Sequence, residues 1–94
     1  MEFAEKLDFL MSMTKMTNST LAHYLVLDTS YISRLRTGKR LMPKSDELIR
    51  RMAGYIAGKL TDNTMRQLNY RVEVLEESTR DVAESFLREN GLIR

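Results

Sequence analysis

Residues 17–36 hold two short amphipathic segments, and these constrain the fold more than any other part of the chain. In each segment the apolar residues recur every three or four positions, which is the spacing of one helix face. Neither face is wide enough to be buried alone, so the two predicted helices must face each other. The small residue Ala22 would let them cross closely at a large angle. The apolar residues of the two faces are Leu21, Ala22, Leu25, Ile32 and Leu35.

A short turn and a helix start are predicted between the two segments. Val26 and Leu27 form the expected turn. Asp28 is the expected N-cap, its carboxylate accepting a hydrogen bond from an N–H group of the first helical turn, with Thr29 as the alternative cap. The second helix is therefore expected to begin at about Thr29.

The order of these residues closely resembles the helix-turn-helix of the lambda-repressor/Cro-like family of transcription regulators. The resemblance covers roughly residues 3–60 and is most specific in the run YISRLRTGKR. There Tyr31, Ile32 and Ser33 match the middle of the family's recognition helix, and residues 38–40 match its exit. The other matching residues are Leu21-Ala22, Leu25, Leu27 and Leu35.

This resemblance implies an all-α fold, a lambda-repressor-like helix-turn-helix bundle followed by a C-terminal helical extension. One residue departs from the family pattern. Val26 stands where the family usually has glycine, and a β-branched residue tolerates a positive φ poorly. We therefore expect a turn wider than the family's.

The implied function is sequence-specific binding of double-stranded DNA by a transcriptional regulator, with the helix at about residues 29–36 in the major groove. Arg34 is physically the best reader of bases because its guanidinium can pair bidentately with guanine. The residues that the resemblance places against base edges are Thr29, Ser30, Ser33, Arg34 and Thr37. The residues expected to contact phosphates are Lys15, Asn18, Arg36, Lys39 and Arg40.

The charge of the chain is unevenly divided. Its net charge is only +2, but residues 1–60 carry ten basic residues against six acidic ones, whereas residues 61–94 carry five against seven. Residues 34–44 hold five of the bases and no acid. A basic cluster directly on and after the recognition helix favours contact with phosphates over a merely solvated face.

Three further features complete the predicted front domain, residues 1–60. A scaffold helix is expected over residues 2–13, and Thr17 or Asn18 is expected to cap the next helix, which ends near Val26. Gly38 can take the left-handed conformation that ends a helix. Pro43 and Ser45 then predict the start of a helix that reaches about Leu60, after a loop able to bury Leu41 and Met42.

The extension over residues 61–94 contains a heptad pattern, interrupted by the polar residue Thr79. We favour a dimer contact, because two copies on a palindromic site multiply the DNA footprint. Packing within one chain is the alternative, and a helix break at residues 78–81 also stays open. The heptad positions are Met65, Leu68, Val72, Leu75, Thr79, Val82 and Phe86; the expected dimer contacts are Leu68, Val72, Leu75, Val82 and Phe86.

Other classes of function find little support in the sequence. There is no cysteine, and the single histidine, His23, cannot form a metal site by itself. No nucleophile motif, paired carboxylates or glycine-rich phosphate loop indicates an enzyme, a cofactor or a small-molecule ligand. No apolar run or leader indicates a membrane, so a cytoplasmic protein is expected. The alternative function is a protein-interaction module that binds through its acidic C-terminal helices.

Overall fold

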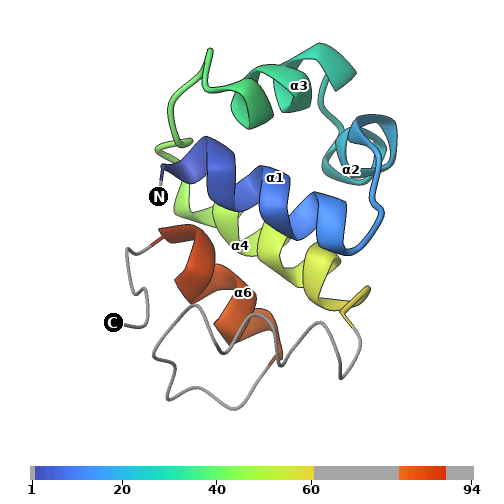
Figure 1. The fold of residues 1–94 in the computed structure, drawn as a ribbon, viewed down its shortest axis with the longest axis vertical. Coiled ribbons are helices and arrows are strands. Elements are labelled where there is room, and N and C mark those ends of the chain that lie inside the picture. The colour runs from blue at the N-terminus through green and yellow to red at the C-terminus, as the bar shows by residue number, and fades with distance from the viewer. Residues whose placement is uncertain (1, 61–78, 89–94) are drawn as a thin grey trace.

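The computed structural model describes residues 2–60 and 79–88, and every regular element in these ranges is an α-helix (Figure 1). The all-α expectation is confirmed for this part of the chain. The predicted fourth helix ends earlier than expected, before Leu60. The helices are α1 (Phe3–Met13), α2 (Asn18–Leu25), α3 (Thr29–Thr37), α4 (Asp46–Ala57) and α6 (Thr79–Arg88).

The helix contacts form a closed ring around one core. α1 packs on α3, α3 on α2, α2 on α4, α4 on α6, and α6 returns to α1. Figure 1 shows α3 at one end of the molecule and α6 at the other. α6 thus closes the ring of contacts. It lies far from α3 but packs on α1, which in turn packs on α3.

The core joins residues from each of the five helices in the described ranges into one apolar cluster. Because buried apolar area is the main stabilising term in folding, this cluster is what holds the ring together. Phe86 from α6 is fully buried, and its ring lies 5.7 Å from that of Phe9 on α1. The buried core residues are Leu7, Leu10, Met11, Met16, Leu21, Ala22, Leu25, Ile32, Leu35, Ile49, Met52, Ala53, Ile56, Ala83, Phe86 and Leu87.

The burial of Phe86 bears on the predicted dimer seam. Phe86 has no exposed surface in this structure, so at this position the heptad pattern packs within its own chain, which is the alternative to the expected dimer contact. Leu68, Val72 and Leu75 lie outside the described residues, as does the side chain of Val82.

An arginine also fastens α6 to α4. The Nη1 of Arg88 donates to Oδ1 of Asp46 at 2.8 Å, and its Nε donates to Oε2 of Glu84 at 2.8 Å. The hydrogen bond to Glu84, followed by that to Asp46, raises the pKa of Arg88 above its ordinary value. The Nη2 of Arg88 also donates to the backbone carbonyl of Asp46 at 3.1 Å, so both the side chain and the main chain at the start of α4 hold α6 in place.

Side-chain caps begin three of the helices. At α1, the N–H of Glu2 donates to Oε1 of Glu5 at 3.1 Å in a capping box. Thr17 caps α2 and Ser45 caps α4, each accepting from an N–H group three residues on. At α3 the predicted carboxylate cap is wrong, because Asp28 occupies the N-cap position without a side-chain hydrogen bond.

α2 and α3 each end at a residue in the left-handed conformation. Gly38 ends α3 with φ of 82°, as predicted. Val26 ends α2 with φ of 58° and ψ of 50°, a conformation that glycine adopts without strain. The expectation of a wider turn assumed that Val26 would avoid a positive φ; Val26 adopts one, and residues 26–28 join the two helices.

No helix in the described ranges is long and apolar enough to cross a membrane.

Candidate nucleic-acid interface

The outward face of α3 carries all five residues predicted to read bases. Ile32 and Leu35 are fully buried, and at about 100° per residue the opposite side of the helix is centred on Ser30, Ser33 and Thr37. Ser33 is half-buried and the other four are exposed. The resulting face has four small hydroxyl residues, one arginine and no acid; its members are Thr29, Ser30, Ser33, Arg34 and Thr37.

Arg36 lies on the inner flank of α3 and links it to two other helices. Its Nη2 lies 2.7 Å from Oδ1 of Asp8 on α1, and its Nη1 donates to Oδ1 of Asn18 on α2 at 2.9 Å. A third contact reaches Oγ of Ser12 at 3.4 Å. These bonds use four of the five guanidinium N–H donors, so in this structure Arg36 serves chiefly to join α3 to α1 and α2, and its expected phosphate contact stays a prediction.

The first turn of α2 is oriented by the same contact. Because Oδ1 of Asn18 accepts from Arg36, the amide nitrogen at the other end of that group can donate elsewhere. Lys15, just before α2, is exposed and has φ of 58°, another left-handed residue. The N–H groups of this turn and a nearby cation are suited to an anion.

The chain leaving α3 supplies two more exposed cations, Lys39 and Arg40. The N–H of Arg40 donates to the carbonyl of Arg34 at 3.2 Å, which folds this segment back against α3. The Arg40 guanidinium lies 5.5 Å from the ring centroid of half-buried Tyr31. This cation–π contact holds Arg40 beside the helix without neutralising its charge.

The structure thus brings four of the predicted phosphate contacts to the two ends of the α2–α3 pair and bonds the fifth, Arg36, to α1 and α2. The sequence could not reveal the role of Arg36, since Asp8 lies 28 residues away and no local pattern connects them. Within residues 2–60 and 79–88, no group of three or more acidic or histidine side chains could hold a metal ion.

No family model matches this chain, and no solved structure matches it significantly. The chemistry of the α3 face must therefore be argued from its own side chains.

Proposed function

We propose that this protein is a sequence-specific double-stranded DNA-binding transcriptional regulator of the lambda-repressor/Cro-like kind. In this proposal α2 and α3 form a helix-turn-helix, and α3 enters the major groove. The observation that carries the proposal is the outward face of α3, where five polar side chains without an acid take little part in packing and lie beside exposed cations.

The side chains on this face suit base edges. Small hydroxyl residues let a helix backbone approach the floor of the groove, and each hydroxyl can donate or accept a hydrogen bond. The methyl groups of Thr29 and Thr37 can contact the thymine methyl. Arg34 lies at the edge of the face, where its long side chain can reach a guanine bidentately.

The flanking groups suit phosphates. Lys15 and the Asn18 amide precede or begin α2, and Lys39 and Arg40 follow α3. Contacts from both sides would fix the position of α3 along the groove without reading sequence. They also make affinity depend on salt, because bound cations displace condensed counterions from DNA.

A homodimer completes the proposal. One helix-turn-helix unit reads few base pairs, and two copies on a palindromic site place their recognition helices one helical turn apart, about 34 Å. Each copy then reads one half-site.

Selection of bound sequences from random duplex DNA tests this function. We expect an enriched palindromic site whose half-sites lie about 10 base pairs apart. The Ser30→Glu variant should lose the enrichment, because it puts a carboxylate against base edges and phosphates. The control is Arg50→Gln, which lowers the net charge equally at an exposed residue of α4, outside the α2–α3 pair. Selection of no sequence by the wild-type protein at low salt would contradict the proposal.

A further inference from the structure

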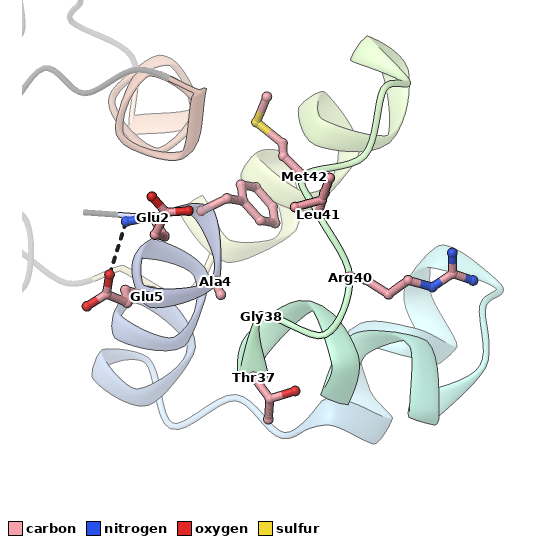
Figure 2. Close-up of a pocket in the computed structure, with 9 residues that line it drawn as sticks. Glu2, Ala4, Glu5, Thr37, Gly38, Arg40, Leu41 and Met42 are labelled. Atoms are coloured by element: carbon pink, nitrogen blue, oxygen red, sulfur yellow. Dashed lines mark hydrogen bonds between the residues drawn. The ribbon is translucent and has the colours of Figure 1, made fainter.

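A groove lies between the first turn of α1 and the chain that leaves α3 (Figure 2). Its volume is about 310 Å³, and it is lined by residues 2–5 at the start of α1 and by Thr37, Gly38, Arg40, Leu41 and Met42. None of the residues predicted to contact bases lines it except Thr37. The groove is therefore largely separate from the face proposed to read DNA.

The rim of this groove exposes apolar surface that the fold does not use. Leu41 is 86% exposed and Met42 is 42% exposed, although the sequence suggested that this loop could bury them. Apolar side chains that lie next to each other and to a groove are typical of a surface that contacts another protein.

The charges around these apolar residues are arranged by sign. Figure 2 shows Glu2 and Glu5 on one side and Arg40 on the other, pointing away from them, with Leu41 and Met42 between. A two-fold axis places each end of such a surface against the opposite end of its copy. An axis through the Leu41–Met42 loop would set the acidic end of one copy against Arg40 of the other.

We propose that a second copy of this chain docks on this groove, with the Leu41–Met42 loops in contact at a two-fold axis. The surface is complementary to itself in both charge and apolar character, which an isologous dimer requires. A guanidinium has five N–H donors, so Arg40 can serve a partner carboxylate and still reach a phosphate.

The spacing of the recognition helices agrees with this contact, and this step rests on the proposed function. α3 has nine residues and is about 13 Å long. Its C-terminal end leads directly into the docking loop, so each α3 centre would lie about 15 to 20 Å from the axis, allowing a few residues of loop. Two such distances are close to the ~34 Å between successive major grooves.

Sedimentation velocity without DNA, over about a hundredfold range of protein concentration, tests the docking. We expect the wild-type mass to rise from monomer to dimer. Leu41→Asp should weaken dimerisation at least about tenfold, because the contact would bury an unpaired charge. The control is Val26→Asp, since Val26 is 85% exposed and lies outside the groove. A monomeric wild type at every concentration, or a Leu41→Asp variant that dimerises normally, would overturn the proposal.

Charge reversal gives a second, independent readout. Glu5→Arg and Arg40→Glu should each weaken the dimer, and the double variant should regain it, because each copy then presents the reversed pair. Circular dichroism checks that the variants stay folded. Weakening by both single variants without recovery in the double variant would also overturn the two-fold arrangement.

These measurements contain no DNA, so they are independent of the proposed function. A monomer that still selects a DNA sequence would leave that function standing and refute only this docking. A dimer that shows no DNA binding would leave the docking standing and refute the proposed function.

Discussion

Two arginines on α3, two positions apart, have opposite environments. Arg34 is exposed at the edge of the outward face, whereas the Arg36 side chain is 19% exposed and bonded to α1 and α2. Two positions on a helix are separated by about 200°, so the difference follows from the position of α1 and α2. The same residue type thus reads DNA at one position, in our proposal, and holds the reading helix in place at the other.

Replacing Arg34 with alanine should relax base preference at one position of each half-site and cost about 1 to 3 kcal/mol of binding free energy. Lys39→Ala is the comparison, since loss of a phosphate contact should weaken binding to all duplexes alike. Affinities for the selected site and its single-base variants measure both effects. An unchanged preference in Arg34→Ala would mean that this arginine does not read a base.

Replacing Arg36 with alanine should lower the free energy of unfolding by about 1 kcal/mol. The loss should be this small because Asp8 is 54% exposed and solvent screens the pair. A double-mutant cycle with Asp8→Ala, followed by urea denaturation, isolates the coupling of the pair. Additive effects of the two substitutions would show that the contact contributes nothing to stability.

The backbone strain at Val26 can be relieved by substitution. It has φ of 58° and is 85% exposed, so its side chain contributes little packing. A left-handed L-residue costs about 1 to 2 kcal/mol, and the greater freedom of glycine in the unfolded chain offsets about half of that. Val26→Gly should therefore raise stability by about 0.5 to 1 kcal/mol. Val26→Ala retains most of the strain, and a melting temperature raised by both alike would argue against this explanation.

At the scale of helices, the features that could be predicted from the sequence are those set by residues close together along the chain. The starts of α2 and α4 follow from cap residues within one turn, and α1 and the outward face of α3 follow from their own apolar spacing. The bond from Arg36 to Asp8 joins distant segments, so no periodicity reveals it. The unused cap at Asp28 and the left-handed Val26 show tertiary packing overriding local preference.

The heptad pattern could not distinguish a dimer contact from packing within one chain, because the spacing of apolar residues is the same in both cases. At Phe86 the partner is α1 of the same chain. Phe86→Ala should therefore lower the free energy of unfolding by about 3 to 5 kcal/mol. Leu41→Ala, at an exposed site, should change it by less than about 0.5 kcal/mol. Urea denaturation compares them, and a small loss at Phe86 would mean that α6 is not part of the cooperative core.

At the scale of the whole molecule, the proposed dimer fixes the salt dependence of DNA binding. Three cations per copy, Lys15, Lys39 and Arg40, give about six phosphate contacts, and affinity should fall about a thousandfold between 50 and 200 mM salt. The Leu41→Asp variant should show about half the slope of log affinity against log salt, because it binds as a monomer. Equal slopes for the two proteins would indicate that both bind DNA with the same number of copies.

The residues on the outward face of α3 are also not part of the hydrophobic core. Ile32, Leu35 and Arg36 fasten the helix from its inner side, and exposed Ser30 and Thr37 on its outer side are not in the core. Substitutions on the outer side should therefore change which DNA is preferred while leaving folding nearly unaffected. If α3 reads DNA as proposed, its preferred DNA sequence can change, by design or in evolution, without further substitutions to restore stability.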